Sequence, residues 1–160
     1  VKLNPEEVNT NITLNGNGLV LIGNEGNFQN GNASLSSYNI NTQQTTSNIY
    51  QAINQEVIGD VLHSIYHSDH LLYLVVNNSG KVIAIDDESL EKKMEIRNLI
   101  SPRKIIKVDN SKFYISDLYA SEVTVYNNYN GAVGKIPVDG WCEDIIIQNG
   151  KAYILSLIHI

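Results

Sequence analysis

The side chains best suited to chemistry lie in three short segments, "IGD", "SPR" and "GWCED", each directly before an expected strand. They include Arg103, whose planar guanidinium offers several donors at once, and the acceptors Asp60 and Glu143. Trp141 adds a large apolar surface with a polar edge. Concave binding sites combine apolar surface with a few oriented polar groups, so these four residues are the predicted ligand-binding set.

Structural roles are open for the same four residues. Asp60 and Arg103 are also able to form an ion pair between neighbouring repeats, where Trp141 is able to pack. Pro102 fixes the direction in which the chain enters the following strand. A binding role and a structural role are therefore both carried forward.

A second group of residues follows the second strand of its repeat and is expected to approach the same face. It comprises Asn24 and Glu25 in "NEG" and Asp117 and Tyr119 in "SDLY". Asn and Asp side chains also hydrogen-bond to nearby backbone in turns, so turn formation is the alternative for both segments.

The sequence gives little support for catalysis or metal binding. His63 and His67 would share a face of a helix, as a metal pair does. "VLHSIYH" is expected to be a strand instead, in which His63 and His67 share one face and His70 lies beyond a turn. Neighbouring carboxylates disfavour the thiolate of Cys142, and no Gly-x-Ser-x-Gly elbow or phosphate-binding Gly-rich loop occurs. Acidic residues such as Asp86 lie in the turn after an expected strand, where the formation of an Asx turn explains them. We therefore expect no catalytic residue, no metal and no cofactor.

Repeated hairpins must position these residues. "HLLYLVVNNSGKVIAIDD" and "SKFYISDLYASEVTVYNN" have the same order of elements, and Tyr73, Tyr114 and Tyr153 align at spacings of 41 and 39 residues. Five Asn-Gly pairs, the strongest local hairpin signal, separate runs rich in Val, Ile and Tyr. The chain is therefore expected to be all-β, with four strands in each unit of about 40 residues.

Units of this size are typical of β-propeller blades, which bury their two apolar faces against neighbouring blades. A β-sandwich would not explain the recurring internal order. The sequence predicts a propeller fragment of a little over three blades, with an insertion or a helical turn within residues 42–60. The expected blades are residues 18–60, 61–100, 101–141 and, incomplete, 142–154.

The two ends of the sequence are expected to lie outside the complete blades. Residues 1–17 are expected to form an edge or an incomplete strand. "LSLIHI", residues 155–160, is expected to break the preceding strand, and it resembles the translation of a sequencing-library adapter. His159 is therefore given no functional role.

Composition excludes several function classes. The net charge of −6 argues against a nucleic-acid-binding surface, which needs clustered Lys and Arg. A single cysteine excludes an intramolecular disulfide framework, and no apolar stretch reaches the roughly 18 residues of a membrane span.

The repeating unit, with "YI" or "YLVV" followed by "V-x-V-x-[DN]", resembles the YncE-like seven-bladed propellers. The words "NEGNF", "IGD", "SPRKI" and "SDLY" are similar, in this order, to the propeller domain of Bacteroidetes exported surface proteins, a family of domains of unknown function. The resemblance covers residues 18–154. One branch of that family consists of outer-surface lipoproteins that capture cobalamin and pass it to a TonB-dependent transporter.

The resemblance implies a non-enzymatic propeller at the cell surface that captures a small molecule for an outer-membrane uptake system. A corrinoid such as cobalamin is the most concrete implied ligand, and a TonB-dependent transporter the implied partner. The alternative is a surface-layer or interaction scaffold that docks protein or glycan and has no small-molecule ligand. An enzyme is a third hypothesis, but it would need metal-binding side chains in the channel, where Ile and Val are expected instead.

Overall fold

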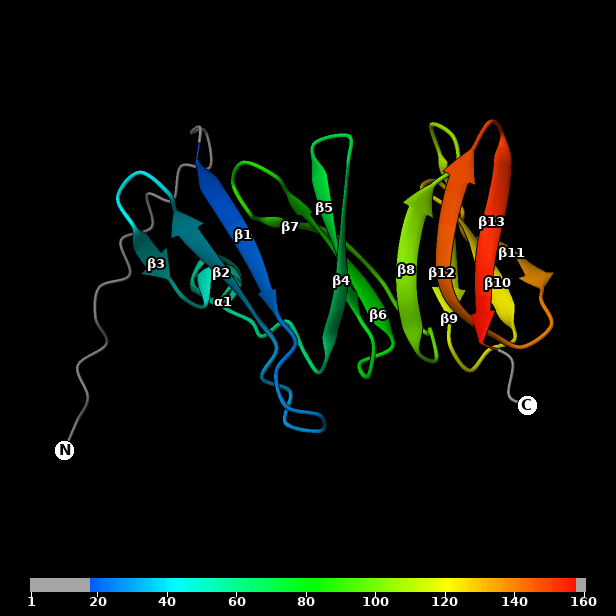
Figure 1. The fold of residues 1–160 in the computed structure, drawn as a ribbon, viewed down its shortest axis with the longest axis horizontal. Helices are drawn as coiled ribbons and strands as arrows, with labels where there is room; N and C mark the ends of the chain where they lie inside the picture. Colours follow the sequence, from blue (N-terminus) through cyan, green and yellow to red (C-terminus); the bar gives the residue numbers. More distant parts are fainter. Residues whose placement is uncertain (1–17, 158–160) are drawn as a thin grey trace.

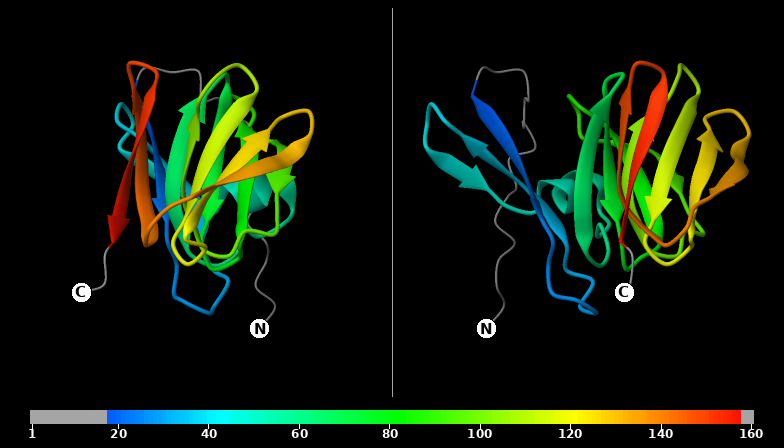
Figure 2. Two further views of the ribbon diagram at one scale, coloured as in Figure 1. Left: turned by 90° about the vertical axis from the view of Figure 1, so that its right-hand side faces the viewer. Right: turned by 45° about the vertical axis from the view of Figure 1, so that its right-hand side comes forward.

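The computed structural model describes residues 18–157. The predictions made for residues 1–17, for His159 and for the end of the adapter-like segment fall outside this range. Within it the chain is almost entirely β, arranged as successive antiparallel sheets (Figure 1). The sheets stand side by side along an open arc, each turned relative to the next, as propeller blades are (Figure 2). The predicted all-β fold of propeller type is confirmed, and the total of seven blades in a ring stays a prediction.

The strands pair in the order of the sequence. The first sheet has three, β1 (Leu19–Asn24), β2 (Ser34–Asn39) and β3 (Gln44–Thr46). The second has β4 (Leu62–Ser68), β5 (Leu71–Val76), β6 (Lys81–Asp86) and β7 (Lys92–Ile96). The third has β8 (Pro102–Lys107), β9 (Lys112–Asp117), β10 (Glu122–Asn127) and β11 (Gly131–Pro137). The last consists of β12 (Trp141–Gln148) and β13 (Lys151–Leu157).

Equivalent turns follow the last strand but one of each of the first three sheets. Asn39, Asp86 and Asn127 end β2, β6 and β10, and the side-chain Oδ1 of each accepts a hydrogen bond from the backbone N–H two residues later. The donor–acceptor distances are 2.9, 3.1 and 2.9 Å. The repeat seen in the sequence is thus also a repeat of hydrogen bonds, and the Asx turn predicted for Asp86 is confirmed.

Alternating side chains of the second sheet pack against the sheets on either side. On β5, Leu72 and Leu74 join the core shared with the first sheet, whereas Tyr73 and Val75 join the core shared with the third. Because successive side chains of a strand point to opposite faces, a strand that is apolar at every position needs a partner on both sides. This sandwiching explains why "LLYLVV" shows no polar alternation.

A short helix, α1 (Ile49–Asn54), fills the segment in which a helical turn was predicted. Ile49 and Tyr50 are buried between the first and second sheets. The Tyr50 hydroxyl donates to Glu56, whose carboxylate also pairs with Lys92 of β7 at 2.6 Å. The helix therefore connects the first sheet firmly to the outer edge of the second.

The C-terminal strand differs from the prediction. The sequence was expected to break at Leu155, but β13 continues to Leu157 and pairs with β12 up to Trp141. The strand continues because residues 155–157 each have a backbone pairing partner on β12. The adapter origin proposed for residues 155–160 stays a prediction.

Both ends of the arc present apolar side chains to solvent. On the last sheet, Ile146, Tyr153 and Leu155 are each more than half exposed. On the first sheet, Val20 and Ile22 of β1 are exposed on the face away from the second sheet. Equivalent positions inside the arc are covered by a neighbouring sheet, so these two faces differ from the rest only in lacking such cover.

Candidate functional site

The innermost strands β4, β8 and β12 carry a β-bulge at the same place. Each bulge adds one unpaired residue near the start of the strand, and these residues are His63, Arg103 and Glu143. They lie 40 residues apart in the sequence. A bulge interrupts side-chain alternation and re-aims one side chain. Because β8 contacts β4 on one side and β12 on the other, the three re-aimed side chains meet.

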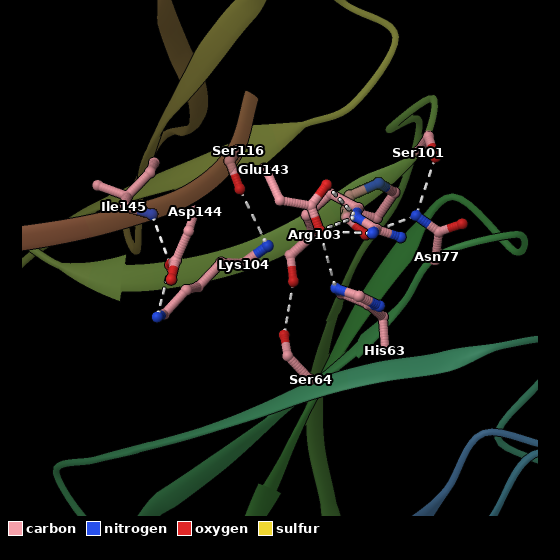
Figure 3. A network of polar contacts seen from close by, with 11 residues as sticks. His63, Ser64, Asn77, Ser101, Arg103, Lys104, Ser116, Glu143, Asp144 and Ile145 are labelled. Carbon is pink, nitrogen blue, oxygen red and sulfur yellow. Dashed lines mark hydrogen bonds and ion pairs between the residues drawn. The ribbon is translucent and has the colours of Figure 1, made fainter. Parts of the chain in front are cut away.

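The centre of this group is the ion pair between Arg103 and Glu143 (Figure 3). The guanidinium Nε of Arg103 donates to both carboxylate oxygens of Glu143 at 3.0 Å, and Nη2 donates to Oε1 at 2.5 Å. Nε2 of His63 lies 3.8 Å from the same Oε1. The side chains are only 21, 23 and 27% exposed for Arg103, Glu143 and His63. A guanidinium that binds a carboxylate through several hydrogen bonds, with both side chains largely buried, forms a stronger and more directional pair than an exposed ion pair does.

The residues directly after each bulge, Ser64, Lys104 and Asp144, make a second set of contacts between the sheets. The Ser64 hydroxyl donates to the backbone carbonyl of Arg103 at 2.6 Å, and Lys104 Nζ lies 2.5 Å from Asp144 Oδ1. These two sets of residues border an open hollow of about 300 Å³ on the inner side of the arc. Its lining residues are His63, Ser64, Ile65, Arg103, Lys104, Glu143, Asp144 and Leu155.

The surroundings of His63 favour the neutral form of its imidazole. Burial lowers its pKa below the ordinary 6.5, and the nearby Arg103 cation lowers it further. The carboxylates of Glu143, Glu25 and Asp144 act in the opposite direction but do not prevail. A neutral imidazole offers one donor and one acceptor, which suits hydrogen bonding to a polar ligand.

Two of the four residues first predicted for binding, Arg103 and Glu143, therefore meet at this hollow. Asp60 lies elsewhere, because its Oδ2 accepts from the backbone N–H of Gln29 at 2.8 Å and from Asn78 Nδ2 at 2.5 Å. It holds the loop between β1 and β2 in place. The alternative of an ion pair between Asp60 and Arg103 is wrong, since Arg103 is occupied by Glu143.

Trp141 packs between sheets, as the structural alternative predicted. Its ring lies edge-on to that of Tyr119, with centroids 5.0 Å apart and planes at 89°. Tyr119 belongs to the loop after β9, so this contact joins the third sheet to the last. The favourable edge-to-face arrangement gives both residues a structural role beside the hollow.

The remaining predicted residues hold turns and loops. Asn24 Nδ2 donates to the hydroxyls of Ser34 and Ser36 at 3.1 and 2.9 Å. The backbone carbonyl of Glu25 accepts from Leu62 N–H at 3.3 Å, and the Glu25 side chain is exposed. Asp117 is buried and accepts from the backbone N–H groups of residues 100 and 101, both at 2.8 Å. None of the three lines the hollow. As direct ligand contacts, they stay predictions.

Sequence reasoning missed His63, Ser64, Lys104 and Asp144, which complete the hollow. His63 was expected to share a strand face with His67, but the bulge at His63 interrupts the alternation on which that expectation depended. His67 instead contacts Asp87, with Nε2 at 2.8 Å from Oδ2. The 40-residue spacing of His63, Arg103 and Glu143 was the signal that could have identified the missing member.

The other candidate chemistry of the chain is structural. Cys142 is buried, and burial raises the pKa of its thiol, with a smaller contribution from the Asp117 carboxylate. The thiolate is thus disfavoured by burial and Asp117, and not by the adjacent Glu143 and Asp144 as expected. That Cys142 is no nucleophile stays a prediction. Among residues 18–157, no group of His, Cys, Asp or Glu side chains is arranged to hold a metal ion. No helix in the same range has the length and apolar character needed to cross a membrane.

Solved structures similar to this chain are β-propellers or propeller-like proteins that share its fold at low sequence identity. A quinoprotein alcohol dehydrogenase-like protein from Bacteroides thetaiotaomicron aligns with a TM-score of 0.68 at 15% identity, covering 87% of this chain and 33% of that one. Sqt1 from Saccharomyces cerevisiae aligns at 0.59 and 16%, covering 87% and 39%. BamB from Moraxella catarrhalis aligns at 0.55 and 15%, covering 76% and 34%. The chain thus spans somewhat more than a third of these proteins at most, and the likeness concerns the fold alone.

Comparison of sequences identifies the family. No curated protein matches the chain. A family described as "Domain of unknown function (DUF5074)" matches residues 17–157, which include all of the strands described above. The resemblance is therefore confirmed as far as a propeller-like domain of unknown function. The Bacteroidetes surface-protein grouping, the YncE-like grouping and the cobalamin branch stay predictions. Because the match covers most of its length, the chain belongs to the DUF5074 family.

Proposed function

We propose that the chain is part of a non-enzymatic binding propeller that captures a small molecule at the hollow between β4, β8 and β12. One observation carries this proposal. Three sheets each contribute one bulged residue, His63, Arg103 or Glu143, and these side chains converge on one another beside the hollow. Bulges are common next to binding and active sites, because they aim a side chain without disturbing the sheet.

The mechanism is capture by a preformed surface. The lining side chains are held by the sheets and by one another, so little conformational freedom remains to be lost when a ligand binds. Ile65 and Leu155 add apolar surface at the edges of the hollow. Its volume of about 300 Å³ lies at the lower end of small-molecule sites, so it fits a small ligand or one part of a larger one.

A corrinoid such as cobalamin is the most concrete ligand, and its only support is the family resemblance. The same resemblance supports a cell-surface location and delivery to a TonB-dependent transporter. All three are expectations about the full-length protein. The ligand is the one most directly tested.

The test is isothermal titration of the full-length protein with cobalamin and with cobinamide. We expect one-to-one binding and a loss of about tenfold or more in affinity for Arg103→Ala, since that change leaves the Glu143 carboxylate unpaired. Arg97→Ala is the matched control, because Arg97 is exposed and pairs with Glu95 away from the hollow. Absence of binding, or equal affinity for the Arg103→Ala variant, would exclude a corrinoid site here.

A protein- or glycan-binding scaffold is the second candidate, and the loop between β1 and β2 favours it. This loop carries Phe28 with 64% of its surface exposed. The loop is nevertheless held across sheets, since Asp60 accepts from Gln29 N–H and Ala33 N–H donates to the carbonyl of Gly59 at 3.0 Å. Aromatic side chains, Phe among them, are enriched in protein interfaces relative to the rest of the surface. If no corrinoid binds, this candidate leads.

A further inference from the structure

The charges that line the hollow neutralise one another in pairs. Arg103 and Glu143 form one pair, and Lys104 and Asp144 form the other. The remaining titratable lining residue is His63, whose lowered pKa favours the neutral imidazole. The hollow therefore presents several hydrogen-bonding groups and no net charge.

Of the two pairs, Arg103 with Glu143 is the costly one to break, because its side chains are only 21 and 23% exposed, against 32 and 43% for Lys104 and Asp144. An anion that displaced Glu143 from Arg103 would break three hydrogen bonds and leave the Glu143 carboxylate, which is only 23% exposed, without its cation. An unpaired, half-buried charge is strongly unfavourable. A cation that competed for Glu143 would leave Arg103 in the same position. Free ions are therefore disfavoured in both directions.

Neutral polar groups do not meet this obstacle. A hydroxyl or a primary amide can donate to a carboxylate oxygen that is already paired, and can accept from Lys104 or the His63 ring, without separating the pairs. Donors and acceptors both line the hollow: Arg103 and Lys104 donate, the Glu143 and Asp144 carboxylates accept, and the His63 ring can do either. A ligand with neighbouring donors and acceptors matches this mixed lining.

We infer that the hollow selects an electrically neutral ligand that carries hydrogen-bond donors and acceptors side by side, as hydroxyl or primary amide groups do, and rejects free anions. This inference rests on the proposed function, because it specifies the ligand class of the same site. It also makes Glu143 the residue that keeps anions away from Arg103. The description of the DUF5074 family names no class of ligand.

The test uses inorganic phosphate as the anionic probe on the full-length protein. The unmodified protein should show no saturable binding, whereas Glu143→Gln should gain at least about tenfold in phosphate affinity, because Arg103 is then free to bind it in a bidentate manner. Glu91→Gln is the matched control, since Glu91 is exposed, pairs with Lys93 and makes the same change in net charge. That control should behave like the unmodified protein.

A doubly exchanged variant, Arg103→Glu with Glu143→Arg, separates charge pairing from folding. It keeps the pair in reverse orientation and should again exclude phosphate, while melting temperatures report whether each variant is folded. The inference is overturned if the unmodified protein binds phosphate as tightly as Glu143→Gln does, or if the folded Glu143→Gln protein gains nothing.

Two neutral probes, cobalamin with its amides and maltotriose with its hydroxyls, distinguish the sources of neutral polar groups. Binding of either should be insensitive to salt, because no net charge is exchanged. Failure of cobalamin to bind removes the corrinoid proposal and leaves the phosphate result standing. Binding of a neutral probe that weakens steeply with salt would contradict the inference while supporting a binding site.

Discussion

At the scale of single residues, His63 is the group whose protonation is most strongly connected to the site. Its imidazole is half-buried, and it lies against Glu143 on one side and near Arg103 on the other. Protonation would add a further cation to Arg103 and Lys104 at the hollow, in a setting that already disfavours charge on the imidazole. The folded protein therefore holds the neutral form more tightly than the unfolded chain does.

This difference predicts a pH dependence of stability. Because the folded pKa of His63 lies below the ordinary 6.5, the unfolded state binds more protons as the pH falls through that value. The free energy of unfolding should decrease from pH 7 toward pH 5, and His63→Gln should reduce this slope. The carboxylates with lowered pKa, such as Asp86 and Asp109, should contribute at lower pH.

Urea unfolding at a series of pH values checks this prediction. His70→Gln is the control, because His70 is almost fully exposed and does not line the hollow. A slope that is the same in the unmodified protein and in His63→Gln would show that His63 is not the responsible group.

At the scale of elements, the loop between β1 and β2 depends on a particular backbone shape. Gly26 has a φ of +81°, and a Cβ placed there would lie 2.6 Å from Asn32 Oδ1 and 2.8 Å from the Ala33 nitrogen. Gly31 in the same loop also has a positive φ, +61°, but nothing lies within 4 Å of its added Cβ. The two glycines therefore separate steric crowding from backbone preference.

We predict that Gly26→Ala destabilises the protein by about 2–4 kcal/mol and Gly31→Ala by about 1 kcal/mol. The first change combines a left-handed residue with a collision against backbone, whereas the second has only the conformational cost. Chemical denaturation of both variants measures the difference. Equal losses would mean that the loop yields to the added methyl group.

The strands could be predicted from the sequence much better than the site could. β5, β6 and β10 lie within the two predicted hairpins, because each is a short run rich in apolar residues with a turn on both sides. The bulges could not be predicted, since the extra residue carries no distinct composition. A single unpaired residue reverses the side-chain alternation, which explains why His63 was assigned to the wrong face.

At the scale of the whole molecule, aligned tyrosines sample very different surroundings. Tyr73 is 2% exposed and packs on Phe113 of the third sheet with ring centroids 5.2 Å apart, and burial raises its pKa to about 12. Tyr153 occupies the equivalent position of the last sheet and is 52% exposed. The neighbouring sheet, and not the repeat itself, therefore determines how much each tyrosine contributes.

Tyr73→Ala should reduce the free energy of unfolding by about 3–4 kcal/mol, because it leaves a cavity between two sheets. Tyr153→Ala should cost less than about 1 kcal/mol if its face is exposed as described. Equilibrium unfolding of the two variants provides the comparison. A large cost at Tyr153 would contradict the prediction and reveal a further partner covering that face.

The bulges also have an evolutionary consequence. Packing between the sheets fixes the core residues, but the residue on each bulge faces the hollow and takes no part in strand pairing. Its identity can change without loss of the core, so binding specificity and folding are under separate selection. His63, Arg103 and Glu143 show three different side chains on one backbone device. Relatives with the same architecture can thus diverge toward new ligands through one substitution per repeat.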